Sequence, residues 1–341
     1  MGAHVVDREL EDLAVSARAA LVREIEASGA FAADPGWRAA FATVPRHLFV
    51  PYYYVSVGGV GGCDRRWGES PDPRTRERWV RGAYEDVPLA TRLRDGVLLS
   101  SSSQPSLMAL MLAELRVEGG EKVLEIGAGT GYNAALLSYR LGEENVTTVD
   151  LDPEITESAR RHLAAAGCRP TVVTGDGARG VPERAPFDRI IATCTLTSIP
   201  RAWLAQCTPG ALILAPLATG LIALTVRDAG YGEGRFLPTA AYFVPLRGSE
   251  RPEPEPVALA GVPSRARENE LFRFLLALTR GTLDPQEAFA LWEREGRPGR
   301  ERYGITVGAE HAWAWLDEPE GAYAWPLPGS SGPGLVGVQV Y

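Results

Sequence analysis

The sequence predicts an α/β protein, built as a three-layer sandwich around a mostly parallel sheet. Between about residues 105 and 210, short aliphatic runs alternate with segments of helical composition, a pattern typical of parallel strands connected by helices. One of these runs, Val123–Ile126, leads directly into a cluster of glycines. Beyond about residue 210 the strand-like runs follow one another without helices, so we expect the sheet to end in antiparallel strands.

Composition limits the class of protein. The chain has 341 residues, of which 45% are hydrophobic and 23% charged, so we expect a globular protein of two domains, or one domain with a large appendage. The net charge of −8 argues against a surface that collects phosphates, and therefore against a nucleic-acid partner. The four cysteines form no C-x-x-C pair, so neither a disulfide framework nor a metal site is expected.

The sequence shows no signal for secretion or membrane insertion. Its N-terminal residues carry acids where a signal peptide needs basic residues and then an apolar core. No stretch approaches the roughly 18 uninterrupted apolar residues of a membrane span. We therefore expect a cytoplasmic protein that has no membrane partner.

The first hundred residues predict one helix and a largely irregular remainder. Apolar residues recur at steps of three and four over residues 7–28, which predicts an amphipathic helix that ends at Gly29. The segment VPRHLFVP, residues 44–51, reads as a loop packed on a core. Residues 56–78 are rich in Gly, Pro and Arg, which predicts an irregular insertion.

Four consecutive serines, residues 100–103, precede Gln104 and Pro105. Ser103, with proline in the first turn, is a good N-cap for the apolar helical run over 107–115. One hydroxyl is enough for a cap, and hydroxyls and amides at a helix N-terminus can also hold a carboxylate. The segment is therefore interpreted either as a carboxylate site or as a simple cap.

The glycine cluster is the strongest local signal. Gly127, Gly129 and Gly131 supply positive φ angles and remove Cβ atoms, so a ligand can lie against the backbone at the carboxyl edge of a parallel sheet. Their G-x-G-x-G spacing is one residue shorter than the dinucleotide fingerprint, which disfavours NAD and FAD. The alternative is that these glycines only form a tight turn between strand and helix.

Two acids accompany the cluster. Glu125 lies inside the first apolar strand, where a charge needs a partner. Asp150 ends the next β-rich run, about 20 residues beyond the loop, where it can accept hydrogen bonds from ribose hydroxyls. Both features favour an adenosyl ligand.

The remaining elements alternate as the fold class requires. Asp176 follows the third strand, where it could accept from an adenine amino group or serve as an ordinary turn aspartate. The predicted elements are a helix from Asp152 that stops at Gly167, strands at 170–174 and 187–194, a short helix at 200–207, and strands at 211–217, 221–227 and 241–246.

The C-terminal part looks like an addition. A charged, proline-rich linker over 249–260 precedes two predicted helices, 265–280 and 285–295, the second with Asp284 as its cap. The last 40 residues suggest a small β unit that ends in the alternating run at 334–341. Its three tryptophans, which we interpret as core residues more than as a binding platform, are Trp313, Trp315 and Trp325.

Five segments, in this order along residues 41–247, together resemble the protein-L-isoaspartate O-methyltransferase family: VPRHLFVP, SSSSQPSLMALML, VLEIGAGTGYNAALLS, GDGARGVPERAPFDRIIATC and AYFVPL. The resemblance implies a Rossmann-like class I methyltransferase core over 101–248, with an N-terminal helix and a substrate-side segment over 1–100. Residues 261–341 would be a small α+β accessory domain. Its segments RYGITV and AWAWLDEP look like the branch of the family that matures ribosomally made peptides, in lanthipeptide and ATP-grasp pathways.

The resemblance implies that S-adenosyl-L-methionine is the cofactor and S-adenosyl-L-homocysteine the product. It places Ser103 and Ser101 beside the acceptor carboxylate as catalytic residues, although Ser102 stands where the family usually has an aliphatic residue. It implies a substrate-binding role for Val44, Arg46, His47 and Gln104. The cofactor contacts that it implies are Ser102, Glu125, Gly127, Gly129, Asp150, Leu151, Asp176, Gly177 and Thr193.

The implied reaction is methylation of an Asp or isoaspartate side chain in a peptide, followed by collapse of the ester to a succinimide. The peptide would be a modified precursor or any damaged protein. We favour the precursor, because a repair enzyme has no obvious use for the residues after 250. A small-molecule methyltransferase and a non-catalytic peptide-binding module are the other readings.

Overall fold

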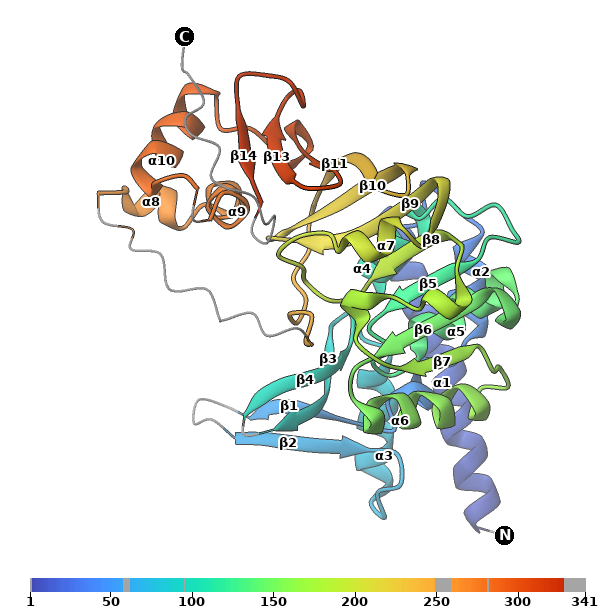
Figure 1. Cartoon of the computed structure of the whole chain (residues 1–341). Coiled ribbons are helices and arrows are strands. Elements are labelled where there is room, and N and C mark those ends of the chain that lie inside the picture. The colour runs from blue at the N-terminus through green and yellow to red at the C-terminus, as the bar shows by residue number, and fades with distance from the viewer. Residues whose placement is uncertain are drawn as a thin grey trace. The chain divides into compact units, whose positions relative to one another are not determined.

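The computed structural model describes residues 2–57, 62–94, 96–248, 259, 261–280 and 282–327, with side chains omitted at 2–7 and 56–63. The chain divides into two compact units, unit 1 up to Gly175 and unit 2 from Asp176 (Figure 1). The predicted linker at 249–260, except residue 259, and the alternating run at 334–341 lie outside the described residues.

Unit 1 begins with the predicted amphipathic helix. Ala14, Leu21 and Ile25 on one face of α1 are buried, and Gly29 follows it with φ of 80°, so the prediction for residues 7–28 is confirmed. The helices of unit 1 are α1 Gly2–Ala27, α2 Trp37–Thr43, α3 Pro73–Ala83, α4 Pro105–Glu114, α5 Tyr132–Leu141 and α6 Pro153–Ala165, with short 3₁₀ turns η1 Arg46–Phe49 and η2 Glu143–Asn145.

A parallel sheet forms the centre of unit 1. Strands β5 Val123–Ile126, β6 Val146–Asp150 and β7 Thr171–Thr174 pair in this order, as their aliphatic runs predict. Helices α5 and α6 connect them along the chain. The carboxyl ends of parallel strands meet at one edge, so the glycine loop and Asp150 share that edge.

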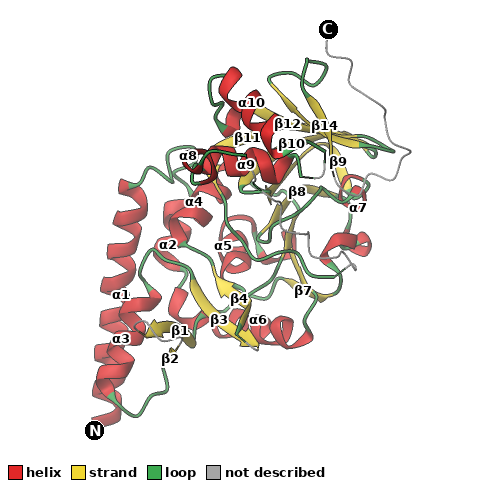
Figure 2. Ribbon diagram, turned by 90° about the vertical axis from the view of Figure 1, so that its left-hand side faces the viewer, coloured by secondary structure: helices red, strands yellow, loops and turns green. Residues whose placement is uncertain are grey.

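A second sheet in unit 1 corrects the prediction of an irregular insertion at 56–78. Its strands are β1 Tyr52–Val57, β2 Gly62–Trp67, β3 Leu89–Arg94 and β4 Val97–Ser102, antiparallel in the order β2-β1-β3-β4. The insertion also contains α3, beside β1 and β2 in Figures 1 and 2. The Asp72 carboxylate caps this helix by accepting from the amides of Arg74 and Thr75. Tyr53, 1% exposed, donates its hydroxyl to main-chain carbonyls of α3. The Gly- and Pro-rich composition concealed this hairpin and helix because their stability comes from packing rather than from local propensity.

Unit 2 is mainly antiparallel. Its strands lie in the order β14-β13-β12-β11-β10-β9-β8, with only β8 and β9 parallel. The strands are β8 Phe187–Ala192, β9 Cys207–Leu217, β10 Gly220–Asp228, β11 Tyr231–Ala240, β12 Tyr303–Val307, β13 Ala312–Leu316 and β14 Ala324–Pro326. The helices are α7 Arg201–Leu204, α8 Ser264–Arg267, α9 Glu270–Leu278 and α10 Pro285–Arg294, with 3₁₀ turns η3 Gly177–Arg179, η4 Pro182–Arg184 and η5 Arg300–Arg302.

The strand predicted at 241–246 is wrong, and the neighbouring strand β11 was missed. Residues 241–246 make one isolated bridge, at Pro245, which has no N–H to continue a ladder. Strand β11 carries glycines that weaken its β signal. One of them is required, because a Cβ atom added at Gly234 would lie 1.9 Å from the carbonyl oxygen of Ala223.

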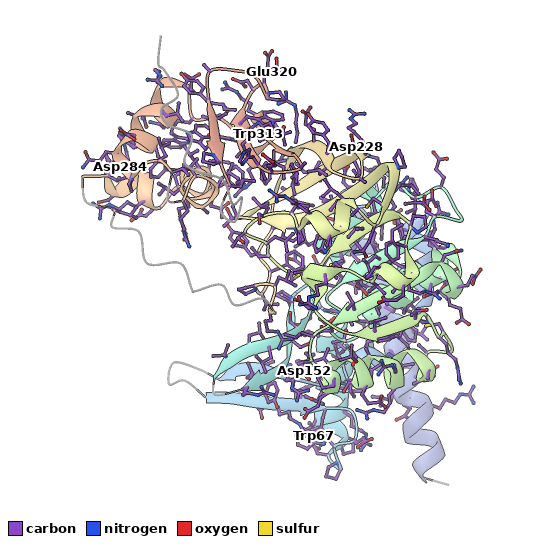
Figure 3. The ribbon with its side chains drawn as sticks, viewed as in Figure 1. Trp67, Asp152, Asp228, Asp284, Trp313 and Glu320 are labelled. Carbon is purple, nitrogen blue, oxygen red and sulfur yellow. The ribbon has the colours of Figure 1, made fainter. Side chains whose placement is uncertain are left out.

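The C-terminal helices follow the prediction in part. Helix α10 begins after the predicted cap, whose carboxylate accepts from the Gln286 amide at 2.8 Å; the cap, Asp284, is labelled in Figure 3. The predicted helix at 265–280 is instead broken into α8 and α9, because Asn269 caps the second of them. Strand β12 pairs with β11, so residues 303–307 extend the sheet of unit 2 where a separate small unit was expected. Trp315 and Trp325 are buried, in agreement with a core role, whereas Trp313 is only half-buried.

Candidate functional site

The glycine loop follows β5 and leads into α5. Gly127, Gly129 and Gly131 have φ angles of 99°, 50° and 87°, a region that residues with a Cβ rarely adopt. The His162 ring, through Nδ1, donates to the carbonyl of Thr130 at 3.0 Å and so holds the loop from α6. The loop therefore presents an open, fixed stretch of backbone at the edge of the parallel sheet.

Asp150 ends β6 beside this loop. Its Oδ2 accepts a hydrogen bond from the Gly129 amide at 3.3 Å, and its side chain is half-buried. Leu151, which follows, is 41% exposed, a large value for leucine at the carboxyl edge of a sheet. A carboxylate beside an apolar side chain suits a ligand that joins a ribose to a flat base.

Glu125 is buried within β5, with 1% of its surface exposed. The Asn133 amide of α5 donates to its Oε1 at 2.8 Å. Burial raises the pKa of Glu125 to about 7, while the neighbouring Thr148 and Asn133 side chains act in the opposite direction. Among the described residues, Glu125 Oε2 and Asn133 Oδ1 are buried without a hydrogen-bond partner. A carboxyl oxygen and an amide oxygen buried beside the glycine loop fit a ligand that forms hydrogen bonds there.

The serine segment lies against the glycine loop. A Cβ atom added at Gly129 would lie 3.5 Å from the carbonyl oxygen of Ser101. Side chains alternate along β4, so Ser100 and Ser102 are buried, while Ser101 and Ser103 are only half-buried. The structure thus brings Ser101, one of the two serines expected beside the acceptor, close to the loop expected to hold the cofactor.

Two expectations for this segment are corrected. The Ser102 hydroxyl points inward and accepts from Arg46 Nε at 3.4 Å, so its side chain does not face a cofactor. Ser103 is not the N-cap of α4. Gln104 takes that position, and its side chain makes no capping bond.

Arg46 binds the main chain of the serine segment from the protein interior. Its guanidinium is 0% exposed, and burial lowers its pKa to about 10, so it remains charged at neutral pH. It donates to five main-chain carbonyl oxygens, those of Ala83, Glu85, Val87, Ser102 and Ser103. The expected contact between this side chain and a substrate is therefore replaced by a positioning role.

His47 is also unavailable to a substrate. It is 8% exposed, its Nδ1 lies 2.7 Å from the Tyr84 hydroxyl, and its ring packs against Trp79. Burial lowers its pKa, which keeps the ring neutral at neutral pH. The expected substrate contact of His47 is corrected in the same way as that of Arg46.

Asp86 was not predicted, although it completes the start of α4. Its Oδ1 accepts from the Ser106 amide at 2.8 Å and its Oδ2 from the Gln104 side chain at 3.2 Å. This carboxylate, 20 residues away along the chain, supplies the cap that Ser103 was expected to supply. No local pattern points to it, since its partners are assembled only by the fold. The Gln104 side chain is therefore engaged in this cap.

Val44 lies away from these residues. It borders a pocket of about 440 Å³ between the end of α2 and the outer side of α5, together with Ser138, Tyr139 and Cys168. The residues that line this pocket include none of the glycine loop or the serine segment. The expectation that Val44 contacts the same substrate as Ser103 has no support in this arrangement.

Three expected cofactor residues belong to unit 2. Asp176 caps η3, with its Oδ1 accepting from the Ala178 amide at 2.9 Å. Gly177 is buried, and its carbonyl accepts from the Trp203 indole at 2.8 Å. Thr193 directly follows β8. Asp176 therefore acts as a turn aspartate, which is one of its two interpretations from the sequence; the other is a contact with adenine.

Comparison with known proteins decides the family. A family model described as protein-L-isoaspartate(D-aspartate) O-methyltransferase matches residues 74–250. The chain belongs to this family. A protein-L-isoaspartate O-methyltransferase 1 of Anaeromyxobacter sp. is 35% identical over 245 residues, which cover 69% of this chain and 97% of that protein. The corresponding protein of Thermotoga maritima is 41% identical over 136 residues, 39% of this chain and 43% of that one.

A solved protein-L-isoaspartate O-methyltransferase structure has the same fold. It superimposes with a TM-score of 0.57 at 24% identity, over 85% of this chain and 96% of that one. The protein is therefore an S-adenosyl-L-methionine-dependent O-methyltransferase with the class I α/β fold. The described part of this methyltransferase contains no group of three His, Cys, Asp or Glu side chains able to hold a metal ion, and no helix there could span a bilayer.

Because the carboxyl of Glu125 is buried, we expect the stability of this methyltransferase to depend on pH. The pKa of Glu125 rises from 4.5 in the unfolded chain to about 7 in the folded one, so the folded state keeps a proton that the unfolded state releases. This contribution is complete below pH 4.5 and is lost as the pH rises through about 7. Between about pH 4.5 and 8, the free energy of unfolding should fall by about 3 kcal/mol more for the wild type than for Glu125→Gln.

Urea unfolding at the two pH values measures this difference. Glu118→Gln, at an exposed position, is the control and should follow the wild type. Parallel pH profiles for the wild type and Glu125→Gln would contradict the assignment of a protonated buried carboxyl.

Proposed function

We propose that this methyltransferase methylates the side-chain carboxylate of an aspartate or isoaspartate within a peptide. The names of its relatives support this substrate class. The observation that carries the proposal is the position of Ser101, half-buried on β4 with its carbonyl next to Gly129; Ser103, also half-buried, follows directly after the strand. An acceptor at these serines would lie beside whatever occupies the glycine loop.

Residues of unit 1 would hold the cofactor by complementary hydrogen bonds. The Asp150 carboxylate would accept from ribose hydroxyls, and Leu151 would cover one side of the base. The buried side-chain oxygens of Glu125 and Asn133 would form hydrogen bonds with the methionine part, directly or through water. On the resemblance alone, we retain adenine contacts for Asp176 and Gly177 and a cofactor contact for Thr193. When bound, S-adenosyl-L-methionine supplies an electrophilic methyl group that a carboxylate can accept.

The chain needs no general base for this reaction. A side-chain carboxyl has a pKa of about 4 and is ionised at neutral pH, so its oxygen is already a nucleophile. The hydroxyls of Ser101 and Ser103 would donate to the carboxylate and orient it. Correct alignment of the reacting groups can supply several kcal/mol of the barrier, on the order of 7 kcal/mol or more in favourable cases. Arg46 contributes indirectly, by fixing the main chain of the serine segment.

The product would be a methyl ester that reacts further without the enzyme. The amide nitrogen of the next residue attacks the ester carbonyl, methanol leaves with the amide proton, and a succinimide (aspartimide) ring remains. Hydrolysis of the ring gives aspartate or isoaspartate.

We favour a tailoring role on one modified precursor peptide, of the lanthipeptide or ATP-grasp type. The support is the part of the chain after residue 250, which the family model does not match. General repair of isoaspartate in damaged proteins is the alternative, and the family relationship accommodates it equally well. Deletion of the C-terminal part is a poor test, because it removes β12 from the edge of β11.

Mass spectrometry of two peptides tests both the activity and the role. The peptides share one sequence and differ only in carrying isoaspartate or aspartate at one position. We expect a gain of one methyl group and then a loss of methanol. A gain on the isoaspartyl peptide alone supports repair, and a gain on the aspartyl peptide supports tailoring.

Serine variants link this activity to the site. Ser103→Ala and Ser101→Ala should each lower kcat/KM roughly 10-fold, the effect of one hydrogen bond to a charged group. Ser16→Ala, on the exposed side of α1, should leave it unchanged. If neither peptide gains a methyl group while S-adenosyl-L-homocysteine still binds, a small-molecule acceptor becomes the better reading. Failure to bind S-adenosyl-L-homocysteine would favour a non-catalytic peptide-binding module.

A further inference from the structure

The four-stranded sheet of unit 1 has one covered face and one accessible face. Tyr53 and its cross-strand partner Arg66 lie on the covered face, where Tyr53 bonds to the main chain of α3. Tyr52 and Tyr54 alternate with Tyr53 along β1, so they lie on the opposite face, and both are half-buried. The accessible face therefore displays aromatic side chains.

A straight row of cross-strand partners connects this aromatic face to the proposed acceptor site. Arg65 pairs with Tyr54, Tyr54 with Ala90, and Ala90 with Ser101, one residue from each strand of the sheet. Directly paired residues project from the same face, so Arg65 and Ser101 share it. Three steps of about 4.8 Å place the two ends of the row roughly 14 Å apart.

The positively charged side chain of Arg65 lies at the end of the row opposite Ser101. The guanidinium of Arg65 lies 4.8 Å from the ring centroid of Tyr52 and 5.4 Å from that of Trp67, labelled in Figure 3. Arg65 is exposed, and in the described part of the chain the two rings hold it and no carboxylate does. Such a cation is oriented in advance and partly shielded from water, and it is complementary to an anionic partner.

We propose that this face is the docking surface for the peptide that brings the acceptor carboxylate to Ser101, and that Arg65 binds an acidic residue of the same peptide. The proposal rests on the proposed function, which it deepens by assigning an acidic peptide as the substrate class. An extended peptide advances about 3.3 Å per residue, so the acidic residue lies about four positions from the acceptor. The hairpin that carries Arg65 precedes residues 74–250, which match the family model.

Three peptides, each made with an aspartyl and with an isoaspartyl acceptor, test the surface. They carry Glu, Gln or Lys at the fourth position on both sides of the acceptor and are otherwise identical. For the wild type, kcat/KM should be about fivefold higher with Glu than with Gln, the size of a surface ion pair, and lowest with Lys. Arg65→Gln should abolish the difference between the Glu and Gln peptides, and Arg65→Glu should reverse the order of Glu and Lys. Arg78→Gln, on α3 behind the covered face, should keep the wild-type order.

Binding of the same peptides, labelled for fluorescence anisotropy, separates the two proposals. Methyl transfer at equal kcat/KM to all three peptides, in the wild type and in Arg65→Gln, overturns the docking surface and leaves the proposed function standing. Arg65-dependent binding of the Glu peptide without methyl transfer overturns the proposed function and leaves the docking surface standing. Equal affinity for the three peptides overturns the surface by itself.

Discussion

Arg46→Ala is expected to lower the free energy of unfolding of unit 1 by about 3–5 kcal/mol, the cost of removing one partner from a buried charged network. The guanidinium serves five carbonyl oxygens of two segments that are far apart in the chain. Without it, all five carbonyls lose this donor, and two of them belong to the buried residues Ala83 and Ser102. Chemical denaturation followed by circular dichroism measures the change.

Arg46→Lys separates charge from geometry. Lysine keeps the positive charge, but its three N–H donors are on a single nitrogen. It therefore cannot donate to all the carbonyls that the planar guanidinium reaches through separate nitrogens. Its loss of stability should therefore fall between those of the wild type and the alanine variant. Arg161→Ala, at an exposed position of α6, should change stability by less than about 0.5 kcal/mol. If the free energy of unfolding of Arg46→Ala is within about 1 kcal/mol of the wild-type value, the positioning role of Arg46 is contradicted.

Asp150→Ala should weaken the binding of S-adenosyl-L-homocysteine by about 100-fold, since a hydrogen bond to a charged group is worth about 1.5–3 kcal/mol. The carboxylate lies at the carboxyl end of β6 and already accepts from the amide of Gly129. Its removal would take away the acceptors that we propose for the ribose, and it removes a support of the loop. Isothermal titration calorimetry measures the affinity.

Asp152→Asn is the matched control for Asp150. Its carboxylate caps α6 by accepting from the Glu154 amide, and asparagine caps a helix about as well as aspartate. Cofactor affinity should therefore stay within about twofold of the wild type. Asp150→Asn keeps the shape with one acceptor oxygen and should be intermediate. Equal loss of affinity in Asp150→Ala and Asp152→Asn would mean that folding, and not contact, explains the effect.

The parallel sheet and its edge could be predicted because their signals are local. Aliphatic runs such as Val123–Ile126 mark strands, and the following glycines leave little choice of backbone. In a parallel sheet with helical crossovers, the chain order alone places Asp150 at the same edge as the glycine loop. The helix caps Asp152 and Asp284 were predictable for the same reason, since a cap and its helix are neighbours in sequence.

The surroundings of the serine segment could not be predicted, because they depend on contacts between segments that are distant in the sequence. The pattern of four serines suggested a cap, but a residue 20 positions upstream, Asp86, does that work. The pairing of Arg46 with Ser102 and Ser103 spans 56 and 57 residues, and no periodicity in the sequence encodes it. The hairpin of β1 and β2 was concealed by its glycines, so the row from Arg65 to Ser101 could not be seen.

By itself, the sequence determined the family, the α/β class, and the sheet edge that carries the glycine loop and Asp150. Those features follow from neighbouring residues, because strand propensity, positive φ angles and helix caps act over a few positions. Only the tertiary structure decided which serines face outward, which buried charge holds them, and which surface leads to them. These depend on side-chain burial and on main-chain partners contributed by remote segments, and a linear pattern of residues carries neither.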